Sequence, residues 1–287
     1  MNWINKQVEK LISKRNRFLV RNIVKNLKKE KVKTISKPSI LIQNQINNPS
    51  SIPVIIINFN QLFYLEQLID FLILKKTKNI IIVDNCSTYL PLLDYYKKIS
   101  ENQNITIEIQ NENLGHLVFW RNRELYKKYS EGFFVITDAD IVPNENLNND
   151  YLKIMLNLLI KNYEFTKVGF ALNIENIPDY YSLKQKVLNW ESQYWNSETE
   201  KNCYNADIDT TFALYWPKVD RIVKNTHPYF FKAIRMGADF TAKHGGWYLD
   251  NENLSDEQLF YLNTSNGSNS WKMDINGILK GDFTNDY

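Results

Sequence analysis

The sequence predicts an α/β fold, built as one domain around a mostly parallel central sheet. Three observations predict it. Short apolar runs rich in β-branched residues recur from residue 54 onward, and segments with helical periodicity separate them. Several of these runs end in Asn or Asp, which places polar side chains at the carboxyl ends of strands. Strands that alternate with helices pair in parallel through right-handed crossovers.

The composition indicates a globular protein with a basic N-terminal arm. The chain has 287 residues, of which 44% are hydrophobic and 14% aromatic, enough to bury a large core. Its formal net charge of +3 is unevenly distributed. Residues 1–37 carry twelve Lys or Arg against two Glu, so this arm has a charge of +10 and the remaining residues −7.

Residues 1–50 are predicted to form a basic amphipathic helix and a linker. Apolar residues within 3–28 recur at helical spacing between basic ones, and residues 34–52 are rich in Ser, Asn, Gln and Pro. The helix either lies on an anionic membrane surface or packs on its own domain with a solvated basic face. The chain has no run of 18 apolar residues, and its two cysteines lack redox or metal spacing. We therefore expect a cytoplasmic protein, peripheral on the inner face of the plasma membrane if the helix binds lipid.

Residues 51–145 are predicted to hold four buried strands with crossover helices between them. The strands are expected at residues 54–57, 79–83, 105–109 and the apolar run that ends at Asp138. The helices are expected at residues 62–74, 90–99 and 117–129.

Residues 146–287 are less regular. Helices are expected at residues 151–161 and 182–195, a strand at 167–172 and an apolar run at 209–215. Aromatic residues are dense here. Some suit stacking on sugar rings, although core packing is the expected role of any single one.

Asp138 and Asp140 stand one residue apart at the end of the fourth run. Two uncompensated carboxylates at this spacing repel each other, and a divalent cation with oxygen ligands relieves the repulsion. The pair therefore predicts a metal site, and a bound metal suggests a phosphate-bearing substrate. Asp84 likewise ends the second strand. It either accepts hydrogen bonds from a base or ribose or caps the helix that follows.

Three further roles compete for the Asp pair, and the flanking residues bear on each. An EF-hand calcium loop is excluded, because Val142 and Pro143 stand where it needs an oxygen ligand and a glycine. A haloacid-dehalogenase-like phosphohydrolase with Asp138 as nucleophile stays open, and residues 281–286 resemble its late acidic motif. Its nucleophile strand normally opens the domain, however, whereas this one comes fourth. A plain helix cap accounts for one Asp better than for two.

The first half resembles the family 2 glycosyltransferases of the GT-A fold, with the motifs in that family's order and spacing. The matching motifs fall within residues 52–145: Val54-Ile-Ile-Ile-Asn-Phe-Asn60, Ile80-Ile-Ile-Val-Asp-Asn-Cys-Ser-Thr88, Asn113-Leu-Gly115, Arg121-Asn122 and Thr137-Asp-Ala-Asp140. Two residues depart from the family pattern, Asn85 in place of an acidic residue and Trp120 in place of an alanine.

The resemblance implies roles for individual residues. Asp138 and Asp140 would hold Mn²⁺ or Mg²⁺ on the diphosphate of a sugar nucleotide, for which a UDP-sugar is favoured. Asp84 would bind the base or ribose. The other expected donor-binding residues of this half are Asn58, Asn60, Asn113 and Arg121.

A looser resemblance to a bacterial subgroup of these enzymes covers residues 209–215, 233–235 and 243–248. His244 is expected either to complete the metal shell through its imidazole or to be structural. Arg235 and Lys243 either neutralise the departing diphosphate or are solvated at the surface.

An inverting transfer needs a carboxylate near the acceptor, outside the metal shell, to deprotonate the acceptor hydroxyl. Asp209 is the first candidate, because it precedes an apolar strand-like run and follows the donor half. The competing role, an ordinary cap or turn formed by Asp-Thr-Thr, is a strong alternative. Asp207 and Glu191 are the alternatives.

The expected function is metal-dependent transfer of a sugar from a nucleotide diphosphate to a saccharide or lipid-linked acceptor, in the synthesis of a bacterial surface polysaccharide. The sugar-nucleotide half would be residues 51–145 and the acceptor half residues 146–287. No nucleic-acid partner is expected. The alternatives are the phosphohydrolase and a non-catalytic protein that binds glycan or membrane.

Overall fold

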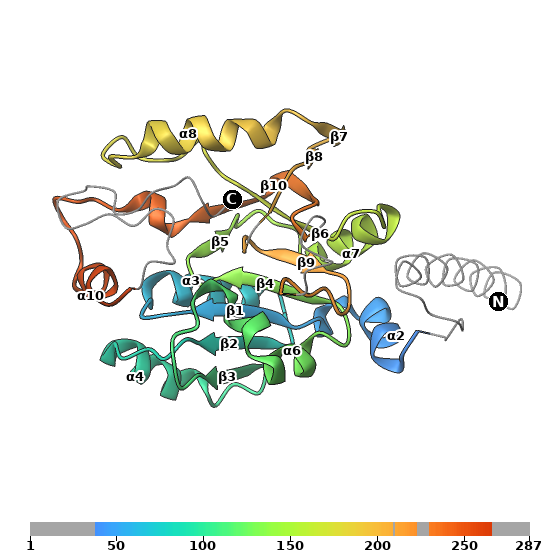
Figure 1. The fold of residues 1–287 in the computed structure, drawn as a ribbon, viewed down its shortest axis with the longest axis horizontal. Coiled ribbons are helices and arrows are strands. Elements are labelled where there is room, and N and C mark those ends of the chain that lie inside the picture. Colours follow the sequence, from blue (N-terminus) through green and yellow to red (C-terminus); the bar gives the residue numbers. More distant parts are fainter. Residues whose placement is uncertain (1–37, 209, 223–229, 266–287) are drawn as a thin grey trace, which may run out of the picture.

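The computed structural model describes residues 38–208, 210–222 and 230–265 (Figure 1). Three predictions lie outside these residues: the amphipathic helix of residues 1–28, the candidate base Asp209 and the acidic segment 281–286. No helix within the described ranges combines the length and the apolar character that crossing a bilayer requires.

Residues 40–51 were expected to be linker, but they form α2 (Ile40–Asn47) and the 3₁₀ helix Pro49–Ser51. Gln45 anchors α2 to the domain. Its buried side-chain amide accepts a hydrogen bond from the backbone N–H of Phe133 at 2.8 Å and donates one to the Phe133 carbonyl at 2.9 Å. The polar composition that suggested a linker belongs largely to the exposed face of this helix.

Within the described residues, ten strands form one sheet in the order β3-β2-β1-β4-β9-β6-β10-β8-β7, with β5 paired to β10. The strands are β1 (Val54–Asn58), β2 (Ile80–Asp84), β3 (Ile105–Ile109), β4 (Phe134–Asp138), β5 (Ile141–Pro143), β6 (Lys167–Leu172), β7 (Glu198–Glu200), β8 (Cys203–Asn205), β9 (Ala213–Tyr215) and β10 (Ala233–His244). In Figure 1, β3, β2, β1 and β4 occupy the lower half of the molecule, and β9, β6 and β10 continue the sheet above them.

The predicted α/β fold with a central sheet is confirmed, and its first half is parallel. β1 pairs in parallel with β2 and β4, and β2 pairs in parallel with β3. The second half is mixed. β9 runs antiparallel to both β4 and β6, whereas β10 runs parallel to β6.

β10 contains a local excursion that leaves the pairing on either side intact. Met236 pairs with Phe170 and Thr241 pairs with Ala171, so residues 237–240 leave the ladder between two adjacent β6 positions. The last residues of β10 then pair antiparallel with β5, and His244 lies opposite Ile141.

Helices cover both faces of the sheet. The described helices after α2 are α3 (Phe63–Leu74), α4 (Leu90–Ile99), α5 (Val118–Arg121), α6 (Arg123–Tyr129), α7 (Tyr151–Lys161), α8 (Lys184–Ser192) and α10 (Asp256–Thr264), and of these α10 buries no side chain. Because side chains alternate along a strand, β1 contributes to two cores. Ile56 packs in the core that includes residues of α3, α4 and α7, and Ile55 packs in the core that includes residues of α5 and α6.

The helix predicted over residues 117–129 is broken at Asn122. This residue has an extended backbone (φ −78°, ψ 98°), and its side-chain oxygen accepts hydrogen bonds from the N–H groups of Glu124 and Leu125 at 3.0 and 3.2 Å. Asn122 therefore ends α5 and caps α6. The apolar periodicity continues through the break, which is why it predicted a single helix.

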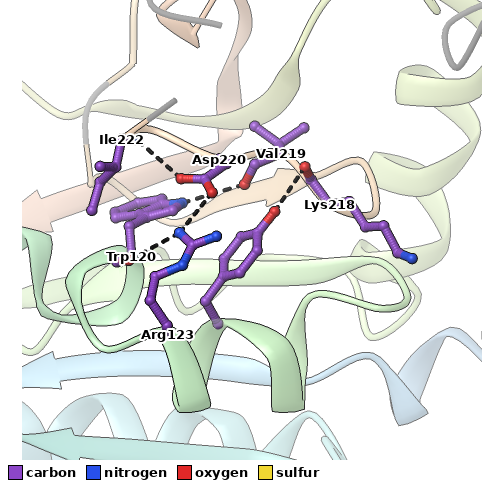
Figure 2. A network of polar contacts seen from close by, with 7 residues as sticks. Trp120, Arg123, Lys218, Val219, Asp220 and Ile222 are labelled. Atoms are coloured by element: carbon purple, nitrogen blue, oxygen red, sulfur yellow. Dashed lines mark hydrogen bonds and ion pairs between the residues drawn. The ribbon is translucent and has the colours of Figure 1, made fainter. Parts of the chain in front are cut away.

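A polar network fastens the segment after β9 to α5 and α6 (Figure 2). The Arg123 guanidinium is paired with the nearly buried Asp220 carboxylate at 2.6 Å. The Trp120 indole N–H donates to the Val219 carbonyl at 3.3 Å. Trp120 is itself fully buried, and its ring packs edge-on against Tyr215. Trp120, one of the two residues that depart from the pattern of the family that the sequence resembles, is thus part of the core.

Candidate functional site

Polar side chains from three neighbouring strands meet at one edge of the sheet. In the parallel register Asn58 lies beside Asp84, and Ile57 lies beside Asp138. Since these strands are parallel, their carboxyl ends share this edge, and such edges are where open α/β sheets bind ligands. The structure thus brings the predicted residues Asn58, Asp84 and Asp138 to adjacent strand ends.

Asp84 is buried and held from two sides. One carboxylate oxygen accepts a hydrogen bond from the Ser87 N–H at 2.8 Å, and the other accepts one from the Tyr96 hydroxyl at 2.8 Å. Burial, together with the Asp84 charge, raises the pKa of the Tyr96 hydroxyl well above its usual range. The hydroxyl therefore stays protonated and fixes the carboxylate. The Ser87 contact closes the turn after β2, whereas α4 begins at Leu90 with no side-chain cap, so Asp84 does not have the alternative role of capping that helix.

Asn58 lies against the same pair and points one unused acceptor inward. Its amide nitrogen donates to the Tyr96 hydroxyl at 2.9 Å and to the Gln61 carbonyl at 3.0 Å. Because a carbonyl can only accept, the amide orientation is settled. The buried Asn58 Oδ1 has no hydrogen-bond partner among the described residues. A buried acceptor without a donor is costly, so it fits a site that a ligand completes.

Asn60 joins three segments through its own polar groups. Its backbone N–H donates to the Ser87 hydroxyl at 2.8 Å, and its side-chain oxygen accepts from the Thr88 N–H at 2.7 Å. The side-chain nitrogen donates to the Thr264 hydroxyl of α10 at 3.0 Å. Its φ of 52° is in the left-handed region that Asn tolerates. These groups are committed within the protein, so Asn60 shapes the loops at this edge.

Asn113 and Arg121 lie in the turn after β3 and at the end of α5. The Asn113 side-chain oxygen accepts from the Gly115 N–H at 2.9 Å, and the exposed Arg121 donates to the Leu114 carbonyl at 2.7 Å. Asn85 connects this turn to β2 by accepting from the Leu114 N–H at 2.9 Å and donating to the Gly115 carbonyl at 3.0 Å. The amide at position 85 supplies this donor, which a carboxylate lacks.

Asp138 and Asp140 have different partners. Asp138 accepts a hydrogen bond from the Thr210 hydroxyl, and its backbone N–H donates to the Thr210 carbonyl at 3.2 Å. Asp140 is held by a turn after β10. Its backbone carbonyl accepts from the Gly245 N–H at 2.7 Å, and its carboxylate Oδ2 accepts from the Gly246 N–H at 3.2 Å.

His244, for which the sequence left a ligand role and a structural role open, lies next to Asp140. The imidazole Nδ1 is 3.6 Å from Asp140 Oδ2, a separation longer than a hydrogen bond. This nitrogen is buried and has no hydrogen-bond partner within the described part of the chain. An imidazole nitrogen and a carboxylate oxygen that face each other fit a divalent cation, which each would bind at about 2.0–2.2 Å.

The predicted three-residue set of Asp138, Asp140 and His244 is not assembled. Across residues 38–208, 210–222 and 230–265, no group of three or more His, Cys, Asp or Glu side chains is arranged to hold a metal ion. Asp140 and His244 form a two-residue set. The Asp138 carboxylate instead accepts the hydrogen bond from Thr210.

Lys243 packs against two tyrosines, one of which, Tyr64, feels the charge of Asp140. The Lys243 ammonium lies 3.9 Å from the ring centre of Tyr248 and 5.6 Å from that of Tyr64. Burial lowers the pKa of Lys243. Burial, and then the charge of Asp140, raises the pKa of the Tyr64 hydroxyl well above its usual range. This part of the edge thus carries the ammonium of Lys243 and the protonated hydroxyl of Tyr64.

Arg235, Glu191 and Asp207 form a separate cluster that links α8 to β10. Arg235 Nη1 and Glu191 Oε2 are 2.6 Å apart, and both side chains are nearly fully buried, with 6% and 5% of their surface exposed. Arg235 Nε also donates to the Asp207 carbonyl at 2.8 Å, while Asp207 is an exposed residue. The Arg235 charge is therefore engaged by Glu191.

Tyr96, Gly245 and Gly246 contribute to the site in ways that their sequence context does not predict. The contacts of Tyr96 come from α4, twelve residues after Asp84 along the chain. The sequence does hold one relevant feature for Gly245 and Gly246: two glycines in succession beside a histidine allow the backbone to approach a ligand closely.

No protein-family model matches this chain, and the search of curated proteins found no match either. Among solved structures, it is similar to the mannosyltransferase PcManGT from Pyrobaculum calidifontis in complex with GDP-Man and Mn²⁺, with a TM-score of 0.44, 15% identity, and coverage of 68% of this chain and 56% of that chain. It is also similar to GalNAc-T7 with UDP, GalNAc and Mn²⁺, with a TM-score of 0.43, 12% identity, and coverage of 68% and 43%. The chain thus spans about half the length of each of these two structures.

Proposed function

We propose that this protein is a metal-dependent glycosyltransferase that moves a sugar from a nucleotide-diphosphate sugar to a saccharide or lipid-linked acceptor. One observation carries the proposal. The Asp140 carboxylate Oδ2 and the His244 Nδ1, which has no hydrogen-bond partner among the described residues, face each other at 3.6 Å, on the edge where Asp84 and Asn58 end their strands. Two candidate cation ligands on the same sheet edge as two buried polar strand ends suit a ligand that joins a diphosphate to a nucleoside.

Asp140 and His244 would hold the cation, Mn²⁺ or Mg²⁺. When bound, it supplies positive charge against the negative charge that develops on the departing diphosphate. The two protein ligands leave the other coordination positions to diphosphate and water oxygens. Imidazole ligation favours Mn²⁺ over Mg²⁺, which prefers an all-oxygen shell.

The nucleoside would lie against Asp84 and Asn58, which offer acceptors to its donor groups. Both oxygens of Asp84 are oriented by Ser87 and Tyr96, and Asn58 Oδ1 awaits a donor. A UDP-sugar is our favoured donor. Lys243, whose ammonium packs on the faces of Tyr248 and Tyr64, would offset the remaining charge of the diphosphate.

The acceptor hydroxyl would lose its proton to a carboxylate of the second half. Asp207 is exposed and suits this role better than Glu191, whose charge is committed to Arg235. Asp209 stays a candidate on the sequence pattern alone. On the same pattern we infer a family 2 enzyme of bacterial surface-polysaccharide synthesis that works in the cytoplasm, with residues 1–28 as a peripheral membrane contact.

Thermal-shift screening of the full chain tests the proposal. One donor among UDP-, GDP-, CMP- and dTDP-sugars should raise the melting temperature only when Mn²⁺ is present. A ligand at about 100 times its Kd adds about 2.7 kcal/mol of stability. Asp140→Asn and His244→Ala should remove this shift, and His116→Ala serves as the matched histidine control. No shift with any donor would refute the proposal.

The two alternatives predict different results. A phosphohydrolase would trap a covalent phosphate on Asp138, and Asp138→Asn would abolish that adduct while donor sugars gave no shift. A non-catalytic glycan-binding protein would retain glycan in the Asp138, Asp140 and His244 variants alike. The His244 Nδ1 beside Asp140, with no hydrogen-bond partner among the described residues, favours the metal-dependent transferase.

A further inference from the structure

The turn Gly245–Tyr248, a short 3₁₀ helix after β10, contacts both candidate ligands of the cation. Its backbone reaches Asp140 through two hydrogen bonds, from Gly245 N–H at 2.7 Å and from Gly246 N–H at 3.2 Å. The second of these goes to Oδ2, the oxygen that faces the imidazole of His244. The turn therefore fixes which way the Asp140 carboxylate points.

Trp247 of the same turn holds the imidazole. The rings of His244 and Trp247 are stacked with centroids 5.0 Å apart and an interplanar angle of 15°. Trp247 is 2% exposed, and its indole Nε1 has no hydrogen-bond partner among the described residues. Packing rather than a polar contact therefore sets its position. The His244 Nδ1 also lacks a hydrogen-bond partner among the described residues. Stacking on the Trp247 ring is therefore the contact that sets the plane of the imidazole.

We propose that Trp247 is a positioning residue for the cation: its indole face orients the His244 imidazole toward Asp140 Oδ2. In most metal sites a hydrogen bond to the second ring nitrogen orients a ligating histidine. Here the indole face of Trp247 has that role. The inference rests on the proposed function, because it assumes a cation between Asp140 and His244.

The principal test compares Mn²⁺ affinity in the full-length protein, measured as free Mn²⁺ by electron paramagnetic resonance, with and without UDP or GDP. Trp247→Leu should weaken Mn²⁺ binding by roughly 10-fold or more, as expected when a residue that orients a metal ligand is lost. Trp247→Phe keeps a stacking face and should restore affinity to within about 3-fold of the wild type. Trp216→Leu, at another buried tryptophan, is the control for a general loss of core packing.

A second variant tests the turn without removing a core side chain. A Cβ at Gly246 would lie 3.0 Å from His244 Cε1, so Gly246→Ala should push the imidazole aside and weaken Mn²⁺ binding as well. Gly237→Ala is its matched control, because a Cβ there would lie 3.1 Å from the Trp195 ring, in the β10 excursion. This control should leave Mn²⁺ affinity unchanged.

The outcomes distinguish the inference from the function on which it rests. If the wild type binds Mn²⁺ and both Trp247→Leu and Gly246→Ala bind it equally well, the positioning role is overturned and the proposed function stands. Equal losses in Trp216→Leu or Gly237→Ala would also overturn it, since the effect would then reflect stability alone. A wild type that binds no Mn²⁺, alone or with either nucleotide, overturns both.

Discussion

At the scale of single residues, neighbouring side chains at the sheet edge make different contacts. Asp138 accepts from Thr210, whereas Asp140 accepts from Gly246 and faces His244. The sequence pattern predicted both Asp residues as ligands of one cation. It could not separate them, because Thr210 lies 72 positions away and its contact depends on how β9 enters the sheet.

Gly245 is required by a close approach of α3. A Cβ at this position would lie 2.4 Å from Cδ2 of Tyr64, well inside van der Waals contact. Gly245→Ala should therefore lower the free energy of unfolding by about 1–3 kcal/mol, the usual cost of overpacking. Urea unfolding measures the loss. In a Tyr64→Ala background the same change should cost much less, and full additivity of the two changes would contradict the steric cause.

Some site residues were predictable from type and place, and others were not. Asp84 and Asn58 follow apolar strands, so their position at the sheet edge follows from the strand pattern. Tyr96 is one of two aromatic residues on the amphipathic helix α4, and nothing local distinguishes it from a core residue. Its contact with Asp84 arises only when α4 packs against β2.

At the scale of elements, α10 is attached to the site edge by a few defined contacts. It buries none of its own side chains in the described structure. Glu257 accepts hydrogen bonds from the N–H groups of Leu62 and Phe63 at the start of α3, at 2.9 and 3.1 Å. This carboxylate satisfies backbone donors that a helix start leaves free. Thr264 adds the contact with Asn60.

The attachment of α10 should depend on pH through Glu257. Burial raises its pKa above the ordinary glutamate value of 4.5, more than its two backbone hydrogen bonds lower it. A carboxyl group whose pKa is raised in the folded state contributes stability below its unfolded pKa, and loses it as pH rises through the folded value. Wild-type stability in urea should therefore fall as pH rises from the ordinary glutamate value through the raised one, and Glu257→Gln should remove that part of the slope. An unchanged slope in the variant would refute the assignment.

The elements of the first half were predictable because buried, β-branched strands and helical stripes give clear periodic signals. Two features were not. α2 was missed because its polar residues suggested a linker, and its anchor is one side chain, Gln45, bound to the distant Phe133 backbone. The break at Asn122 was missed because a cap residue interrupts the backbone without interrupting the apolar pattern.

At the scale of the whole molecule, the second half is held together by a buried ion pair. Arg235 of β10 and Glu191 of α8 are both almost fully buried, and the guanidinium also lies 4.1 Å from the ring centre of Tyr194. Such a pair sets how helix and sheet are arranged, because each charge needs the other once water is excluded. The sequence suggested Arg235 and Glu191 as separate site residues. It could not show that the two are buried and paired, because burial and pairing are not visible from composition.

Removing one member of this pair should be far more damaging than removing both. Arg235→Met leaves Glu191 buried without its counter-charge and should cost about 3–5 kcal/mol of unfolding free energy. The double variant Arg235→Met/Glu191→Leu should recover most of this loss. Chemical denaturation of the two variants gives the comparison, and a double variant no more stable than the single one would show that the pair contributes more than mutual neutralisation.

The excursion of residues 237–240 in β10 has a practical consequence for engineering. Pairing with β6 resumes at the next β6 residue, so chain length can vary between Met236 and Thr241 without shifting the alignment of either flanking segment. A reporter peptide or a fluorophore-bearing insertion placed there would leave Arg235 opposite Gly169 and His244 opposite Ile141. The protein thus carries a natural insertion point on the strand that ends at the candidate metal ligand.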